Sequence, residues 1–237
     1  MLRELNIYPL WVRRNAPVEP EAVPAPAVPV EGARPVPVTS AEPGLRQPET
    51  SSAASLSWPE LKQQVRDCTA CKLRAGCTQT VFGVGDEKAE WLFVGEGPGA
   101  DEDAQGEPFV GQAGKLLDNM LAAIKLKRGS NVYIANIVKC RPPNNRTPEP
   151  DEIATCLPYL HRQIELIKPK LIIALGKTAA TSLLGRDATL GSLRATIHDF
   201  RGVPLIVTYH PAYLLRSPAE KAKAWQDLCF AVQRMAE

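Results

Sequence analysis

Short apolar runs alternate with helical segments along residues 58–237, and this order constrains the fold more than any other feature of the sequence. We expect strands at 90–94, 132–136, 170–175 and 203–208, where mostly apolar residues lie between turn-forming residues. Strands that alternate with helices build a parallel sheet covered by helices on both faces. The sequence therefore predicts an α/β fold with three α/β/α layers and a central four-stranded parallel sheet.

Helices are expected in the gaps between these strands, where apolar residues recur at helical spacing. The last helix follows a capping box at residues 217–220. We expect its core face to hold Trp225, Leu228 and Val232.

The first 57 residues differ in composition from the rest of the chain. Residues 16–57 are rich in Pro, Ala and Val without a helical period, which predicts a disordered extension. Residues 1–15 are more apolar, so we expect either a docking motif for a protein partner or a segment that folds back on the body. The expected domains are 1–57 for the extension and 58–237 for the folded part.

The bulk composition excludes several classes of protein. Hydrophobic residues make up 44% of the chain and no run of 18 apolar residues occurs, so no membrane span is expected. The N-terminus lacks a secretory signal, which predicts a cytoplasmic protein, and we expect a monomer. The net charge of +2 is weak, so any nucleic acid must contact a local basic face.

Four of the six cysteines form a candidate metal-binding set. Cys68 and Cys71 make a CxxC pair, and Cys140 and Cys156 make a second, looser pair. Four thiolates without a neighbouring histidine suit either a [4Fe–4S] cluster or structural zinc. The spacing favours iron–sulfur, because zinc ribbons usually supply two close CxxC pairs.

A glycine-rich segment, residues 95–100, follows the first predicted strand and fits a loose dinucleotide-binding pattern. A nicotinamide or flavin enzyme is therefore an alternative. Pro98 and the three carboxylates at 101–103 argue against it, because negative charge would lie where a pyrophosphate must bind.

Four motifs lie at or near the ends of predicted strands: GEGPGADED (95–103), GEPFVG (106–111), NIVKCRPPNNR (136–146) and HPAYLLR (210–216). Together with the four cysteines, they resemble the family 4 uracil-DNA glycosylases, the iron–sulfur branch of the uracil-DNA glycosylase superfamily. The resemblance covers residues 58–237. It implies a [4Fe–4S] cluster and a monofunctional DNA-repair hydrolase that cuts the N-glycosidic bond of deoxyuridine, releasing uracil and leaving an abasic site.

The resemblance also implies a uracil pocket. Asn136 is expected to pair with uracil O4 and N3–H, and Phe109 to stack on the base. His210 would donate to uracil O2, where charge develops in the transition state. Glu96 and the backbone N–H of Gly97 would complete the pocket.

An acid of the loop at residues 101–103 is expected to position the water molecule that hydrolyses the glycosidic bond. Gly97 stands where the best-known branch of the superfamily has a water-positioning aspartate, so another acid must act. Glu102 is the candidate to orient water or stabilise the sugar cation, and Asp101 and Asp103 are its rivals.

DNA contacts are expected from two loops. An apolar wedge followed by an arginine fits the gap left by a flipped base, and Lys139 is expected to meet a phosphate. The other residues expected to bind DNA are Arg141, Arg146, Tyr213, Leu214, Leu215 and Arg216.

Two further alternatives share this fold. One is a superfamily relative that binds uracil or another damaged base. The other is a nonenzymatic iron–sulfur DNA-binding module, which would lose nothing when Asn136 or His210 is changed.

Overall fold

The computed structural model describes residue 53 and residues 55–236. The predictions of a docking motif at residues 1–15 and of a disordered extension fall almost wholly outside the described residues. The first helix, α1, begins at Trp58, where we expected the folded part to begin.

A six-stranded sheet with the order β1-β3-β2-β4-β6-β5 forms the centre of the fold. Its four central strands run parallel and coincide with the four predicted strands. They are β2 (Trp91–Gly95), β3 (Val132–Asn136), β4 (Leu171–Leu175) and β6 (Val203–Thr208). The α/β class and the parallel centre are thus confirmed, whereas the predicted count of four strands is two too low.

The two additional strands lie antiparallel at the edges of the sheet. β1 (Val84–Gly85) pairs with β3 and is only two residues long. β5 (Ile197–Phe200) pairs with β6 through a hairpin whose two turn residues, Arg201 and Gly202, both have positive φ. That backbone geometry is typical of a two-residue hairpin turn, but Arg-Gly is a weaker sequence signal for it than Asn-Gly.

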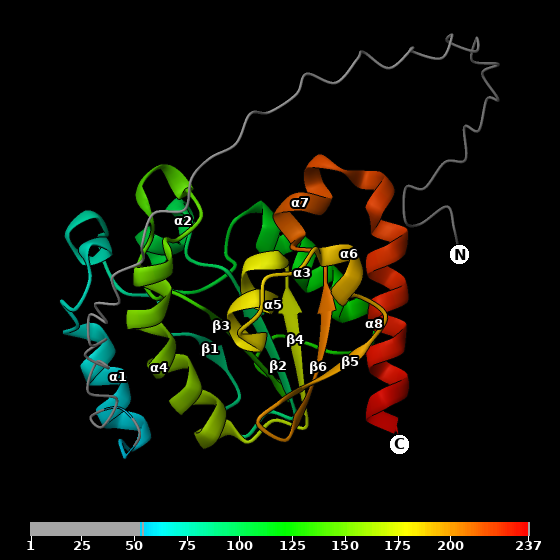
Figure 1. The fold of residues 1–237 in the computed structure, drawn as a ribbon, viewed down its shortest axis with the longest axis horizontal. Helices are drawn as coiled ribbons and strands as arrows, with labels where there is room; N and C mark the ends of the chain where they lie inside the picture. Colours follow the sequence, from blue (N-terminus) through cyan, green and yellow to red (C-terminus); the bar gives the residue numbers. More distant parts are fainter. Residues whose placement is uncertain (1–52, 54, 237) are drawn as a thin grey trace, which may run out of the picture. The chain divides into compact units, whose positions relative to one another are not determined.

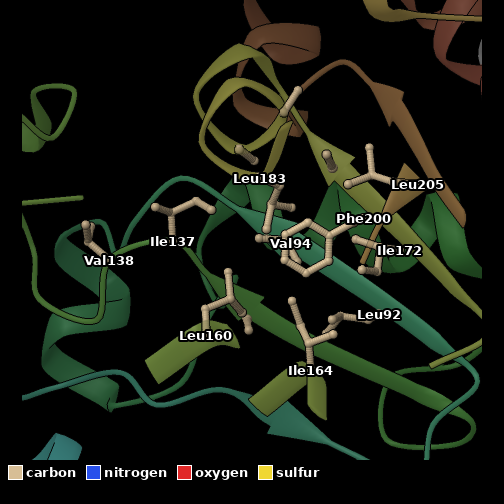
Figure 2. Close-up of a cluster of buried hydrophobic side chains, with 14 of the residues drawn as sticks. Leu92, Val94, Ile137, Val138, Leu160, Ile164, Ile172, Leu183, Phe200 and Leu205 are labelled. Atoms are coloured by element: carbon tan, nitrogen blue, oxygen red, sulfur yellow. The ribbon is translucent and has the colours of Figure 1, made fainter. Parts of the chain in front are cut away.

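Side chains of the central strands alternate between two hydrophobic cores, as the period-two geometry of a strand requires. Leu92, Val94, Ile172 and Leu205 lie in the first core (Figure 2). This face of the sheet is covered by α4 (Pro150–Ile167), α5 (Lys177–Leu184) and α6 (Leu190–Leu193).

The opposite face packs against two helices. Phe93 of β2 and Ile173 of β4 lie in the second core. The helices that complete this core are α3 (Gln112–Ala123) and α8 (Lys221–Ala236). The predicted three-layer arrangement is therefore present.

The core face of α8 differs from the prediction. Trp225 and Val232 are 46% and 39% exposed, although Leu228 is buried as expected. The buried face instead includes Asp227, whose carboxylate accepts hydrogen bonds from Arg194 and from the hydroxyl of Thr208. The local sequence does not reveal this buried acid, because its partners Arg194 and Thr208 lie on distant segments.

Several short elements follow the carboxyl ends of the central strands. Figure 1 shows the arrowheads of β4 and β6 directed towards the end of the sheet where α7 (Pro211–Arg216) lies. α2 (Ala100–Gln105) follows β2, and the 3-10 helix η2 (Pro143–Asn145) follows β3. Residues from distant parts of the sequence thus meet at one edge.

The remaining elements flank Cys68 and Cys71 or precede the last helix along the chain. They are α1 (Trp58–Arg66), the 3-10 helix η1 (Lys72–Gly76) and the 3-10 helix η3 (Pro218–Glu220). Within the part of the chain that the structure describes, no helix has the length and apolar character needed to cross a membrane.

Candidate active site

A pocket of about 500 Å³ lies at the carboxyl end of the sheet, where parallel α/β folds place their binding sites. The ends of β2, β3 and β6 all contribute to it. All five residues predicted to bind uracil line this pocket: Glu96, Gly97, Phe109, Asn136 and His210. The structure therefore brings the predicted uracil-binding set together.

Asn136 carries an unpaired acceptor in this pocket. The residue is 2% exposed, and its Oδ1 has no hydrogen-bond partner among the described residues. A Cβ atom at Gly95 would lie 2.4 Å from Oδ1, so only glycine leaves room for the amide. An unpaired buried acceptor costs free energy, which a ligand that donates a hydrogen bond would recover.

The backbone of Asn136 is fixed by a buried lysine. Lys139 Nζ donates to the carbonyl oxygen of Asn136 at 2.9 Å and to Gln163 Oε1 at 2.6 Å. Burial lowers the pKa of Lys139 to about 8. The expectation that Lys139 meets a phosphate is wrong, because its side chain is 1% exposed and is bonded inside the fold.

His210 is held as a neutral imidazole. Burial, aided by the positive charge of Arg216, lowers the pKa of His210 to about 4. Nδ1 accepts the backbone N–H of Ala212 at 3.1 Å, at the start of α7. The ring proton of the neutral form therefore resides on Nε2, which can act as a hydrogen-bond donor.

Phe109 forms the aromatic wall of the pocket. Its ring stacks on that of His210, with the centroids 5.5 Å apart and an interplanar angle of 29°. Its backbone has a φ of 57°, a left-handed value that is uncommon for a residue with a Cβ atom. A Cβ atom at Gly95 would meet the ring at 2.6 Å, so the glycine that accommodates the Asn136 amide also accommodates the ring.

The three acids of the loop have different positions. Glu102 lines the pocket, and its carboxylate accepts the N–H groups of Gly99, Val110 and Gly111 at 2.9–3.1 Å. Asp103 is buried and accepts from the backbone of Thr78. Asp101 is exposed, so Glu102 is the only one of these three acids that lines the pocket.

The predicted DNA-contacting residues of α7 are divided between solvent and core. Tyr213 and Leu215 are 40% and 44% exposed, and Tyr213 and Arg216 line the pocket. Leu214 is 1% exposed and lies in the interior, so Leu215 is the leucine that a DNA strand can reach.

The two arginines after β3 differ in their partners. Arg146 lines the pocket and makes two hydrogen bonds to the carboxylate of Glu152, at 2.9 and 2.7 Å. Arg141 donates to the Asn145 side chain at 2.7 Å. Both lie in the loop that the sequence predicted to contact DNA.

Four polar residues of the pocket were missed by the sequence reasoning: Asn145, Thr147, Lys177 and Thr178. The Thr178 hydroxyl donates to Glu96 at 2.5 Å. The strand-end rule could have identified Lys177 and Thr178, because they follow β4 directly.

A second, smaller pocket contains the cysteine set. Cys68, Cys71, Cys140 and Cys156 all line it, and all six cysteines of the chain are free thiols. Among the described residues, no three His, Cys, Asp or Glu side chains meet closely enough to hold a single metal ion.

Donors already point at two of these sulfurs. The backbone N–H of Lys139 points at Cys156 Sγ at 3.2 Å, and the Tyr159 hydroxyl at Cys68 Sγ at 3.4 Å. Burial raises the pKa of Cys156 to about 11, with the Lys139 charge opposing that rise. The thiols of the metal-free protein must therefore lose protons when metal binds.

Comparison with known proteins identifies the family. Residues 82–229 match the model of the uracil DNA glycosylase superfamily. The chain is 45% identical over 170 residues to the type-4 uracil-DNA glycosylase of Archaeoglobus fulgidus, an alignment that covers 68% of this chain and 85% of that protein. It is 44% identical over 165 residues to the type-4 uracil-DNA glycosylase of Thermotoga maritima, covering 69% and 85%.

The similarity to a type-5 protein is lower than the similarity to the type-4 proteins. The type-5 uracil-DNA glycosylase of Pyrobaculum aerophilum is 30% identical over 148 residues, covering 55% of this chain and 64% of that protein. Identity to the type-4 proteins is thus higher and extends over more of both chains. The chain belongs to the uracil-DNA glycosylase superfamily and, within it, to the type-4 uracil-DNA glycosylases.

Proposed function

We propose that this chain is a DNA-repair glycosylase that hydrolyses the N-glycosidic bond of deoxyuridine, releasing uracil and leaving an abasic site. The observation that carries the proposal is Asn136 Oδ1, a buried acceptor that lacks a partner among the described residues and belongs to a pocket-lining side chain. Uracil N3–H would donate to Oδ1, and the Asn136 amide would donate to uracil O4. Cytosine has no N3–H and carries an amino group at C4, so both contacts would be lost.

The base must leave the DNA stack to reach this pocket, because the target bond is covered in a duplex. Phe109 then supplies a planar surface on which the flipped base stacks. Phe109 is only 5% exposed and its ring stacks on His210, so the ring needs little further ordering when a base binds.

His210 would stabilise the departing base. Negative charge grows on uracil O2 as the glycosidic bond breaks, and a donor placed there acts mainly on the transition state. The Nε2–H of the neutral ring can make this bond while Nδ1 remains engaged with Ala212. The low pKa of His210 keeps the ring neutral under ordinary conditions, so it acts as a hydrogen-bond donor and carries no positive charge.

Glu102 would serve the sugar side of the reaction. Three backbone N–H groups hold its carboxylate in one orientation at the pocket wall. A fixed negative charge stabilises the cationic sugar, and its remaining lone pairs can orient the attacking water. Asp101 and Asp103 are weaker candidates, since neither lines the pocket.

The cysteine set fits a [4Fe–4S] cluster. Four thiols around one pocket, with donors at two of the sulfurs, provide the ligands that such a cluster takes. We assign it a structural role, because glycosidic hydrolysis transfers no electron. It would cross-link the segment after α1, the loop after β3 and α4.

DNA binding would use the rim of the pocket. Lys177 and Arg216, both exposed, can approach phosphates. Tyr213 stacks on Tyr209 with centroids 5.4 Å apart, so its exposed ring is supported from behind. Tyr213 or Leu215 would fill the gap left by the flipped base. A cytoplasmic location, a monomeric state and a protein partner for residues 1–15 stay predictions.

The test of the proposed function is a strand-cleavage assay. Labelled DNA with one uracil, single- or double-stranded, is incubated with the protein and then treated with alkali, beside matched cytosine and thymine strands. Breaks at uracil alone are expected. Uracil-selective binding without breaks would favour the alternative of a binding protein, and breaks at another damaged base would favour a relative with altered specificity.

A further inference from the structure

We infer that Arg128 is a positioning residue that holds the backbone of Phe109 in the conformation needed for stacking on the base. The inference rests on the proposed function, because it assumes that a flipped base lies against Phe109. Arg128 is not among the residues that line the pocket, so its effect must pass through the Phe109 loop.

The guanidinium of Arg128 contacts two consecutive carbonyls of that loop. Nη1 donates to Pro108 O at 2.8 Å and Nη2 donates to Phe109 O at 2.7 Å. Nε donates to Asp118 Oδ1 at 3.0 Å, which fixes the plane of the guanidinium. The planar group thus bridges adjacent carbonyls and an outer carboxylate, a geometry that lysine cannot reproduce.

The loop needs such support because Phe109 has left-handed backbone angles. A residue with a Cβ atom keeps this conformation only where the surrounding structure imposes it. The carbonyl of Phe109 is packed so closely that a Cβ atom at Gly114 would lie 1.7 Å from its oxygen. The Phe109 carbonyl that accepts from Arg128 is therefore also packed against Gly114 of α3.

The next two residues are held through their N–H groups. Val110 and Gly111 both donate to Glu102 Oε1, at 2.9 and 3.1 Å. An anion therefore fixes the amides after Phe109, while a cation fixes the carbonyls at and before it. Loss of the Arg128 guanidinium would free the carbonyls of Pro108 and Phe109 while the contacts to Glu102 remain. The backbone of Phe109 would then relax from its left-handed conformation.

Loss of Arg128 is expected to weaken the binding of uracil-containing DNA selectively. If the loop relaxes, the Phe109 ring leaves its position 5.5 Å from His210, and the stacking surface is lost. The residues proposed to meet phosphates, Lys177 and Arg216, lie on other segments. Affinity for DNA that lacks uracil should therefore remain.

The experiment compares Arg128→Met with the wild type and with Arg162→Met. Arg162 is a matched control, because it also donates to a backbone carbonyl, that of Leu56 at 2.7 Å, and does not line the pocket. The probe is a duplex with one 2′-fluoro-deoxyuridine, which resists cleavage, beside the same duplex with thymidine. Arg128→Met should lose about tenfold in affinity for the first duplex and be unchanged on the second. Arg162→Met should match the wild type on both.

A double-mutant cycle tests whether Arg128 acts through Phe109. In the Phe109→Ala background, Arg128→Met should produce no further loss of uracil-selective affinity. An equal loss in both backgrounds, or an equal loss on both duplexes, would overturn the inference. Arg128→Lys, which can pair with one carbonyl, should fall between the two extremes and covers the case in which Arg128→Met folds poorly.

The two proposals fail in different ways. If the wild type cleaves uracil DNA but Arg128→Met keeps full uracil affinity and rate, only the role of Arg128 is refuted. If the wild type neither cuts nor selects uracil DNA, the proposed function itself is wrong.

Discussion

The side-chain nitrogen of Lys139 lies 2.9 Å from the backbone oxygen of Asn136, deep inside the protein. The backbone N–H of the same lysine points at Cys156 Sγ, 3.2 Å away. One residue thus joins the cysteine pocket to the strand end that is proposed to read the base. The side chain of Lys139 therefore braces the end of β3, while its backbone N–H contacts the cysteine pocket.

Lys139→Met should lower the free energy of unfolding by about 2–3 kcal/mol, because the Asn136 carbonyl and the Gln163 side chain would lose a charged donor. The measurement is denaturant unfolding of both proteins. Lys170→Met is the control: that lysine is 67% exposed and pairs with Glu90, so its loss should cost well under about 1 kcal/mol. Equal effects of the two changes would contradict the bracing role of Lys139.

Asn136→Ala should slow uracil excision about a thousandfold, because the base would lose both contacts proposed for the Asn136 amide. The single-turnover rate on uracil DNA is the quantity to measure, since it separates chemistry from product release. Asn144→Ala, in the exposed turn of the η2 loop, should excise at the normal rate. Near-normal excision by Asn136→Ala would refute its assignment as the base-reading residue.

His210 should make stability fall in mild acid. Its pKa is about 4 in the folded protein and 6.5 as the ordinary value, so the unfolded chain binds the proton first as the pH is lowered. The stability from the neutral ring is complete above pH 6.5 and is lost as the pH falls towards 4. The two values correspond to about 3 kcal/mol in total.

Unfolding curves between pH 7 and pH 4.5 test this prediction for the wild type and His210→Gln. His161, whose pKa is also lowered to about 4 by burial, contributes in the same direction, so His161→Gln is the companion variant. Each substitution should flatten the pH dependence. A His210→Gln curve parallel to the wild type would mean that His210 does not remain neutral through this range.

Cys140→Ala should yield colourless, poorly folded protein, because the proposed cluster would lose one of its four ligands. Iron, sulfide and zinc contents, together with the visible spectrum, are the measurements. Cys229→Ala, which changes a cysteine outside that pocket, should remain brown and fold normally. Zinc in place of iron and sulfide would correct the metal, and a full cluster in Cys140→Ala would refute the ligand set.

The sequence predicted the centre of the fold well because buried parallel strands are apolar throughout. Each residue of β2, β3 and β4 is buried, and Asn136 is a polar residue only at the very end of β3, so the apolar runs stay recognisable. β5 reads Ile-His-Asp-Phe and is largely exposed, which hides an edge strand from a search for apolar runs. The α8 face was misassigned because the partner of Asp227 is Arg194, 33 residues earlier in the chain.

The sequence could predict those site residues that lie at the carboxyl ends of the strands. Asn136 and His210 lie at or just past the ends of predicted strands, which predicted that they share a pocket, while their roles in it came from the family resemblance. Lys139 and Leu214 were assigned to DNA because local sequence does not reveal burial. Arg128 gave no signal, since its carbonyl partners lie about twenty residues earlier in a loop whose strain depends on packing.

The residues proposed to read the base and those proposed to contact DNA lie on different kinds of backbone. Asn136 ends a central strand, whereas Tyr213 and Leu215 lie on the solvent side of the short helix α7. Substitutions of the exposed Tyr213 and Leu215 would therefore change the proposed contacts with DNA without disturbing Asn136. The position of Asn136, in contrast, depends on Gly95, whose missing side chain leaves room for both the Asn136 amide and the Phe109 ring. Any descendant that keeps the Asn136 amide and the Phe109 ring in place is therefore expected to keep a glycine at position 95.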